Sequence, residues 1–207
     1  AKDQSYVLFG IDRSLLPRMM LPVGGYRKSD IRKIAADLGL RVAEKKDSQE
    51  ICFVTSGEHG DFVRQRRGGE SLSGEIMTTD GKVVGQHEGI ERFTIGQRRG
   101  LGVALGEPQF VVRIEPQSRR VIIGSHDDLA RRQLQADRLN WLVDPPEGRF
   151  ECLVQIRYNS SPQAAHAEQG PDGKLHVTFV EPCFGVAPGQ AVVLYDEDRV
   201  LGGGWIL

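Results

Sequence analysis

One cysteine stands in a sequence context that could activate a thiol. The stretch KKDSQEICFV, residues 45–54, places two lysines ahead of Cys52. A reactive cysteine needs positive charge or a helix N-terminus to stabilise its thiolate, and Lys45 and Lys46 lie close in sequence. The alternative is structural, because an apolar run around a free cysteine is typical of a core strand. Composition alone favours that structural interpretation for Cys52.

Two further stretches combine residue types that bind anions and bases. In TIGQRRGLGV, residues 94–103, glycines flank Arg98 and Arg99, whose guanidinium groups can fork onto phosphate oxygens. In QIRYNSSP, residues 155–162, Arg157 precedes Tyr158 at the end of an expected strand. Arginine for phosphate and tyrosine for stacking is a common pair on RNA-binding barrels, although adjacent strand residues share a ligand only across a bend.

The remaining candidates are weaker as isolated signals. Gln190 follows a Pro-Gly turn in GVAPGQAVVLYD, residues 185–196, where the pattern alone indicates only a turn and a strand. Cys152 and Cys183 lie in strand-like surroundings and are interpreted as structural. Neither a metal-binding His/Glu spacing, a Ser-His-Asp set nor a phosphate-binding loop occurs in the sequence, so no bound metal is expected.

Composition describes an ordinary globular chain with an uneven charge distribution. Three widely spaced cysteines among 207 residues argue against a disulfide framework and suit a reducing cytoplasm. No apolar run approaches the length of about 20 residues that spans a bilayer, so no membrane association is expected. Although the net charge is −1, residues 92–132 hold eight arginines against four acids. That bias favours one electropositive face.

Helical patterns occupy the first third of the chain. A helix is expected over Gln4–Phe9, followed by a short turn after Asp12. In SDIRKIAADLGL, residues 29–40, apolar residues recur at helical spacing, with Ser29 as the expected N-cap and Gly39 as the stop. A short strand is expected around Val42.

The rest of the chain is β-prone. Asp80-Gly81 between two short apolar runs predicts a hairpin. From Gln109 onward, strand-like runs separated by turn residues predict a small antiparallel barrel or sandwich. The fold class is therefore multi-domain, with an α/β remnant over 1–57, a small central mixed domain over 58–126 and a C-terminal β-barrel over 127–207.

The same strings, with AKDQSY and LPVGGYRKSDIRKIAADLGL, resemble the bacterial tRNA-specific 2-thiouridylases along the full length and in order. The resemblance implies a preceding ATP-pyrophosphatase module of the adenine-nucleotide α-hydrolase type, of which residues 1–57 would be the end. Its nucleotide loop and first catalytic cysteine are expected upstream of Ala1. The chain is thus expected to be a fragment that is inactive alone, with ATP and Mg²⁺ bound outside it.

The resemblance also implies residue roles. Cys52 occupies the position of the persulfide-bearing cysteine, which transfers sulfur to the 2-position of the wobble uridine and then forms a disulfide with the upstream cysteine. Lys2, Asp3, Gln4, Arg157, Tyr158 and Gln190 occupy tRNA-contacting positions, and Arg98 and Arg99 are added from charge and glycine context.

The expected partners follow from that activity. They are tRNA and a persulfide donor, either a sulfur-relay protein or a cysteine desulfurase, and the protein is expected to be a cytoplasmic monomer. The alternative from a different functional class is a non-catalytic RNA-binding β-barrel module.

Overall fold

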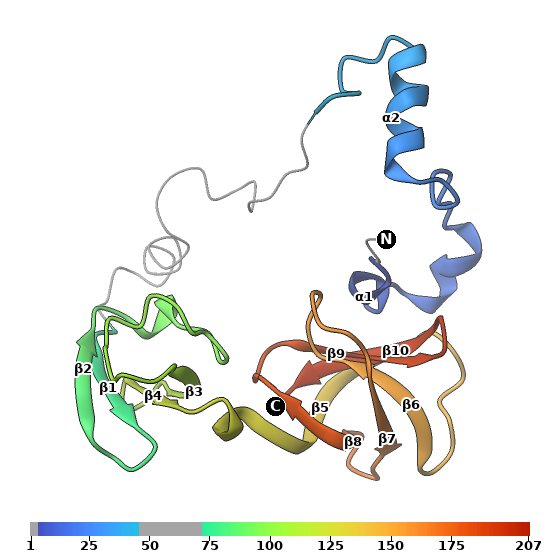
Figure 1. The fold of residues 1–207 in the computed structure, drawn as a ribbon. Coiled ribbons are helices and arrows are strands. Elements are labelled where there is room, and N and C mark those ends of the chain that lie inside the picture. The colour runs from blue at the N-terminus through green and yellow to red at the C-terminus, as the bar shows by residue number, and fades with distance from the viewer. Residues whose placement is uncertain (1–3, 46–71) are drawn as a thin grey trace.

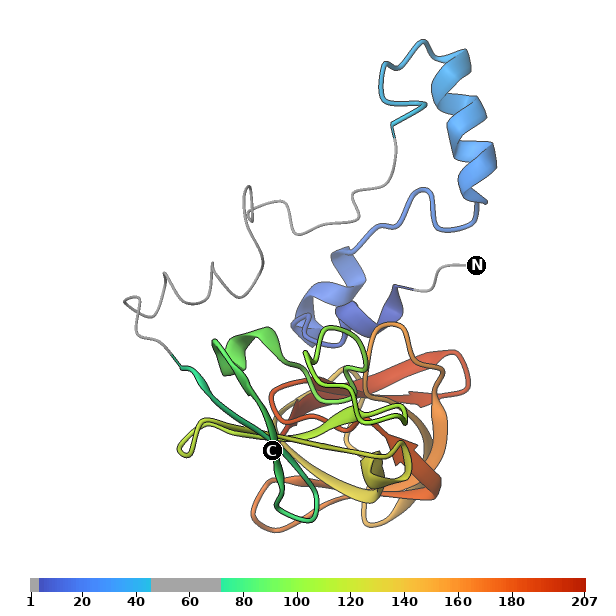
Figure 2. The same ribbon diagram turned by 60° about the vertical axis from the view of Figure 1, so that its left-hand side comes forward.

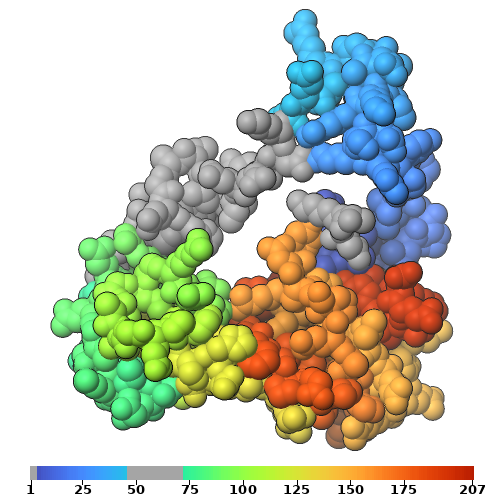
Figure 3. All heavy atoms as spheres, viewed as in Figure 1, coloured from blue at the N-terminus to red at the C-terminus, as the bar shows by residue number. Residues whose placement is uncertain are grey.

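The computed structural model describes residues 4–45 and 72–207, which form a helical segment and two separate β units (Figure 1). The four-stranded sheet and the barrel lie side by side, and the helical segment runs from the barrel away from both (Figures 1 and 3). The expected fold class, mixed α/β followed by a closed antiparallel barrel, is confirmed. The expected domain boundaries after residues 57 and 126 stay predictions.

The helical segment contains α1 (Ser5–Leu8), a 3-10 helix (Arg13–Arg18) and α2 (Lys28–Asp37). The end of α2 is as predicted: Gly39 has φ +67°, and the Leu40 amide donates to the Ala35 carbonyl at 2.9 Å. This hydrogen bond between residues six positions apart, counted inclusively, satisfies a carbonyl at the helix end. It requires a residue in the left-handed conformation, which glycine adopts without a Cβ clash.

The helix predicted over Gln4–Phe9 is present as α1, one residue shorter at each end, with Gln4 and Phe9 as its caps. Two other local predictions in this segment are wrong. The N-cap of α2 is Arg27, while Ser29 lies inside the first turn and its hydroxyl donates to Asp30. Residues 41–44 form a turn, with hydrogen bonds from the Ala43 amide to the Leu40 carbonyl and from the Lys45 amide to the Val42 carbonyl. These local bonds satisfy backbone groups that a strand would need a neighbour to satisfy.

The central unit is a mixed sheet in the order β2-β1-β4-β3. Its strands are β1 (Gly74–Thr78), β2 (Val83–His87), β3 (Phe110–Glu115) and β4 (Arg120–Gly124). The predicted hairpin at Asp80-Gly81 is confirmed, with Gly81 at φ +89°. Strands β1 and β4 pair in parallel. The apolar core of this unit includes Ile76, Val111, Val121 and Ile123. Strands β3 and β4 therefore belong to this sheet and not to the barrel.

Six strands close the C-terminal barrel in the order β10-β5-β8-β7-β6-β9. They are β5 (Ala130–Trp141), β6 (Phe150–Gln155), β7 (Gln163–Gln169), β8 (Leu175–Phe184), β9 (Ala191–Asp196) and β10 (Arg199–Ile206). Alternate residues fill the interior, including the fully buried Leu175, Val192 and Leu194. Closure removes the free sheet edges that would otherwise expose unpaired backbone groups.

Strand β7 was not predicted from the sequence. Its inward residues are Ala165 and Ala167, and its other residues are polar, so it lacks the branched and aromatic residues typical of strands. Pairing with β6 on one side and β8 on the other holds it in place. The small alanines lie opposite Phe179 and Val177, whose larger side chains occupy the interior.

No helix in the described ranges is long and apolar enough to cross a membrane.

Candidate nucleic-acid interface

The predicted site residues are divided among the parts of the chain. Cys52, Lys2 and Asp3 lie outside the described residues. Gln4 is exposed just before α1, and Gln190 is exposed just before β9. Arg157 and Tyr158 are half-buried in the turn after β6, while Arg98 and Arg99 are exposed in a loop of the central unit.

The segment that begins with α1 lies against the barrel (Figure 2). Two aromatic residues, Tyr6 and Phe9, pack it there. The Tyr6 hydroxyl donates to the Ala191 carbonyl at 2.8 Å, and burial raises the pKa of this phenol to about 12, with neighbouring Tyr195 adding to the shift. The Phe9 ring meets the Trp205 ring edge-on, with 6.0 Å between centroids. A protonated, hydrogen-bonded Tyr6 thus anchors the helix that follows Gln4.

A side-chain amide of the barrel fixes the chain that leaves α1. Asn140 of β5 donates through Nδ2 to the Phe9 carbonyl at 2.6 Å and to the Ile11 carbonyl at 2.8 Å. Both carbonyls lie beyond the end of α1, where backbone groups have no helical partner. The two bonds fix the exit direction of the segment that leads to α2.

The turn containing Arg157 and Tyr158 is built around a buried glutamine. Gln155 donates through Nε2 to the Arg157, Tyr158 and Ser160 carbonyls at 2.9, 3.2 and 2.8 Å. Its Oε1 accepts from the Tyr195 hydroxyl at 3.1 Å, so both ends of the amide are bonded. The bend required by the adjacent Arg-Tyr pair is therefore present at the end of β6.

The two side chains of that pair contact different neighbours. Tyr158 meets Tyr6 of α1 edge-on, with 6.4 Å between ring centroids. Arg157 reaches toward the central unit, where its Nη2 donates to the Ile95 carbonyl at 2.5 Å and also to the Gly185 carbonyl of the barrel at 2.9 Å. Tyr158 is thus joined to the α1 contact, and Arg157 bridges two units.

Tyr6 is the residue that joins the predicted positions, and sequence reasoning missed it. It lies two residues after Gln4, contacts the Tyr158 ring, and bonds to Ala191, the residue after Gln190. Tyr6 therefore joins the segment that follows Gln4 to Tyr158 and to the neighbour of Gln190. The available signal was the tyrosine within the string KDQSY.

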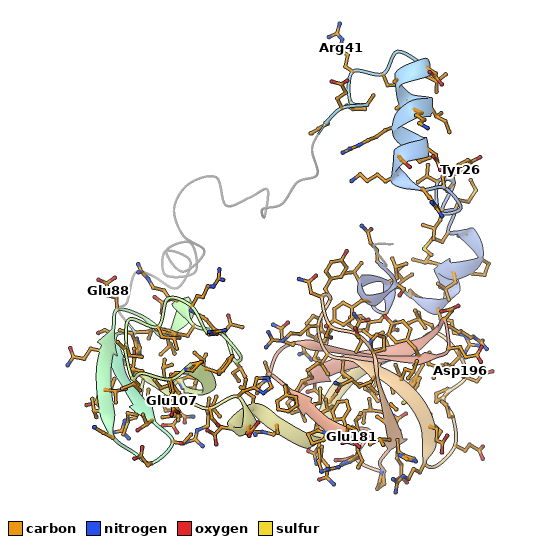
Figure 4. All side chains as sticks on the ribbon, in the orientation of Figure 1. Tyr26, Arg41, Glu88, Glu107, Glu181 and Asp196 are labelled. Atoms are coloured by element: carbon orange, nitrogen blue, oxygen red, sulfur yellow. The ribbon has the colours of Figure 1, made fainter. Side chains whose placement is uncertain are left out.

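A groove beside Gln4 adds basic and aromatic residues that were also missed. It has a volume of about 760 Å³ and is lined by Gln4, Tyr26, Arg27 and Lys28, with Val23, Gly24 and Ile31. Figure 4 shows Tyr26 at the base of α2, on the side of the molecule that carries the helical segment. An aromatic ring beside two cations is suited to a nucleotide, because it offers stacking together with phosphate binding. The signal was the string GYRKSD.

The loop bearing Arg98 and Arg99 contributes a second, shallower hollow. A space of about 390 Å³ is lined by Arg98, Glu107 and a glycine-containing turn. In Figure 4, Glu107 lies on the central unit and Glu181 on the barrel. Arg98 and Arg99 are thus on a different unit from Tyr158 and Gln190, and the Arg157 bridge connects the two. Within residues 4–45 and 72–207, no group of three or more His, Cys, Asp or Glu residues could hold a metal ion.

The two described cysteines are free and buried, in agreement with their structural interpretation. Burial raises the pKa of the Cys152 thiol to about 12 and that of Cys183 to about 11. Because the thiolate is the reactive form, both thiols are inert near neutral pH.

We therefore expect that iodoacetamide at pH 8 alkylates neither Cys152 nor Cys183 in the native chain. In 8 M urea, both cysteines are expected to be alkylated. Peptide mass spectrometry measures the modification. Above pH 9 the unfolded state releases these protons first, so stability falls as pH rises through the folded pKa values. Native-state alkylation of Cys152 at the rate of an exposed thiol would contradict this assignment.

Three family models match successive parts of the chain. They are described as the tRNA methyl transferase HUP domain (residues 1–56), the tRNA methyl transferase PRC-barrel domain (60–125) and the aminomethyltransferase beta-barrel domain (131–206). The sheet and the closed barrel occupy the second and third ranges. The chain thus has the domain set of a tRNA-modifying enzyme.

Similarity to curated proteins identifies the particular family within this class. The tRNA-specific 2-thiouridylase MnmA of Rhodopirellula baltica is 56% identical over 99% of this chain and 53% of its own length. Those of Carboxydothermus hydrogenoformans and Koribacter versatilis are each 45% identical, over 99% and 100% of this chain and 56% and 57% of their own lengths. The chain belongs to the tRNA-specific 2-thiouridylase family and spans about half the length of these relatives.

Proposed function

We propose that the protein containing this chain is a tRNA-uridine 2-sulfurtransferase that thiolates the wobble uridine. The observation that carries the proposal is the 56% identity over 99% of the chain to a protein named as a tRNA-specific 2-thiouridylase. The contacts of Tyr6 support it, because they bring Tyr158 and Ala191, the neighbour of Gln190, to the helix that follows Gln4, and all three of Gln4, Tyr158 and Gln190 are expected to contact RNA.

In the proposed reaction, the carbonyl oxygen on carbon 2 of the uridine attacks the α-phosphorus of ATP, which adenylates the oxygen and releases pyrophosphate. The terminal sulfur of a Cys52 persulfide then attacks that carbon, and AMP leaves with the oxygen. A second cysteine, expected outside this chain, attacks the Cys52 sulfur, breaks the S–S bond to the transferred sulfur and forms a disulfide. Adenylation converts a poor leaving group into a good one, and a thiol is the residue type that can carry sulfur.

This chain supplies Cys52 and the RNA-binding surface, and the site for ATP and Mg²⁺ lies outside it. Gln4, just before α1, contacts the tRNA together with Tyr158 and Gln190 of the barrel, and Lys2 and Asp3, which precede Gln4 in sequence, are further tRNA-contacting residues. Arg98 and Arg99 bind phosphates from the central unit. The persulfide donor is a relay protein or a cysteine desulfurase, and the protein works as a cytoplasmic monomer. The 207-residue chain alone is inactive.

Deletion of the encoding gene tests this function. We expect 2-thiouridine derivatives to disappear from hydrolysed cellular tRNA in the deletion strain and to return when the full-length gene is restored, as measured by nucleoside mass spectrometry. A non-catalytic RNA-binding module would leave these nucleosides in place. Unchanged 2-thiouridine levels in the deletion strain would therefore refute the sulfurtransferase and favour the module.

A further inference from the structure

One guanidinium group bonds both sides of the junction between the central unit and the barrel. Arg157 Nη2 donates to Ile95 of the central unit and to Gly185 of the barrel, at 2.5 and 2.9 Å. Gly96 and Gly185 flank it with φ of +84° and +78°. A Cβ on either glycine would lie 3.6 or 3.4 Å from Nη2, so the two turns close directly around the group.

A second contact crosses the same junction. The His126 ring, just before the first barrel strand, stacks on Phe184 with 4.3 Å between centroids and 23° between planes. It also meets Phe110 of β3 edge-on at 5.4 Å. Two adjacent residues of the barrel are therefore contacted at this junction: Phe184 by the His126 ring and Gly185 by the Arg157 guanidinium group.

The loop bearing Arg98 and Arg99 is fixed to the part that Arg157 contacts. The Gly96 amide donates to the Val111 carbonyl at 2.8 Å, and the Val111 amide donates to the Gln97 carbonyl at 2.9 Å. The Gln97 side chain donates to the Arg99 carbonyl at 2.9 Å and accepts from the Thr94 amide at 3.0 Å. Hydrogen bonds thus connect an arginine on the barrel to the loop that bears two arginines on the neighbouring unit.

We propose that Arg157 is a positioning residue, which sets the orientation of Arg98 and Arg99 relative to the RNA-contacting residues of the barrel. The inference rests on the proposed function. It assigns to Arg157 an action through protein carbonyls, in place of the direct phosphate contact that the resemblance implied. The ligand it serves is an RNA segment long enough to touch the Arg98–Arg99 loop and the Tyr158 face together.

The physical reason is effective concentration. Two weak RNA-binding surfaces act together when the second binds intramolecularly, and the gain is greatest when their spacing matches the ligand. If the two units moved independently, an RNA bound at one surface could reach the second surface for only part of the time, and its affinity would be lower. Arg157 is suited to prevent this because a rigid fork can bond two carbonyls in fixed directions, whereas a lysine ammonium is a point charge on a flexible stem.

The first experiment measures orientation without RNA. In the full-length protein, spin labels are introduced as unnatural amino acids at Lys82 in the β1–β2 turn and Asp198 in the β9–β10 turn, both exposed. The distance distribution from pulsed electron resonance is expected to be narrow in the parent and broader in both Arg157→Lys and Arg157→Gln. The matched control is Arg149→Gln, an exposed arginine of the same barrel, which is expected to keep the narrow distribution. Unchanged distributions in both Arg157 variants would overturn the proposal.

The second experiment measures tRNA affinity in a double-mutant cycle. Arg157→Lys is expected to weaken binding about tenfold, the magnitude typical of couplings through a protein network. Combined with Arg98→Gln and Arg99→Gln, it should cost nothing further, because the positioned groups are already absent. Retained affinity in Arg157→Lys would overturn the positioning role, and so would losses that multiply in the combined variant, because they would show that Arg157 acts independently of Arg98 and Arg99. His126→Ala, which loosens the same junction from another side, should also weaken binding.

The two experiments separate failure of this inference from failure of the proposed function. If the parent protein bound no tRNA, the proposed function would fall, while the spin-label distances would still report whether Arg157 orients the units. If tRNA binds and thiolation proceeds but the distances are insensitive to Arg157, the positioning role alone is wrong. Melting temperatures of all variants identify any loss due to unfolding.

Discussion

A Cys52→Ser variant of the full-length protein is expected to bind tRNA as the parent does and to form no detectable 2-thiouridine. Serine is nearly the same size, so the RNA-binding surface is preserved, but its oxygen cannot carry the sulfur to be transferred. Removal of a covalent nucleophile typically lowers turnover by about a thousandfold or more. Nucleoside mass spectrometry after incubation with tRNA, ATP and a persulfide donor measures the product, and filter binding measures the affinity.

The matched control is Cys183→Ser, which alters a buried thiol with a pKa raised by burial to about 11. It is expected to lower stability, because the thiol is buried, and to retain thiolation per folded molecule. Thiolation by Cys52→Ser at the parent rate would remove Cys52 from the mechanism. Loss of tRNA binding in that variant would show that Cys52 has a structural role.

Gly203→Ala in β10 is expected to lower the stability of the protein strongly. A Cβ at this position would lie 2.4 Å from the Val192 carbonyl oxygen of the paired strand and 2.7 Å from Cδ2 of the Phe9 ring. The first contact is with backbone and requires β9 and β10 to separate, and the second displaces α1. Overpacking of this kind typically costs about 3 kcal/mol, or a fall in Tm of roughly 6–12 °C for a chain of this size. Differential scanning calorimetry measures the shift.

Gly25→Ala supplies the control, because a Cβ there would meet nothing within 4 Å. Its Tm is expected to stay within about 2 °C of the parent, as for an exposed surface change. A Gly203→Ala protein that melts with the control would show that β9 and β10 adjust without strain.

The sequence predicted the parts of the fold that local patterns encode. The Asp80-Gly81 hairpin and the left-handed Gly39 depend on the backbone preferences of a few neighbouring residues, so they were predictable. Strand β7 depends on partners on both sides and on the space that Ala165 and Ala167 leave in the barrel. The expected strand at Val42 failed for the converse reason, because β-prone residues form a strand only where a neighbour can pair.

The candidate site shows the same division. Motif strings identified the Arg157-Tyr158 pair, but no local pattern could show that Arg157 bonds a carbonyl 62 residues earlier in the chain. Tyr6 was missed for a similar reason, since its partner carbonyl is 185 residues away. Sequence thus located the positions, and only the tertiary contacts showed which of them act together.

The docking of α1 on the barrel has a consequence for biosynthesis. Tyr6 and Phe9 pack against Ala191, Gly203 and Trp205. These three residues lie near the C-terminal end of the chain, so they leave the ribosome long after Tyr6 and Phe9. At about 5–20 residues per second, the helix waits roughly 10–40 s for its partner. During that interval Tyr6 and Phe9 lack these barrel partners, and a nascent chain stalled before β10 still lacks Gly203 and Trp205, against which Phe9 packs. Chaperone engagement is therefore expected to centre on this early segment until the last strand of the barrel closes.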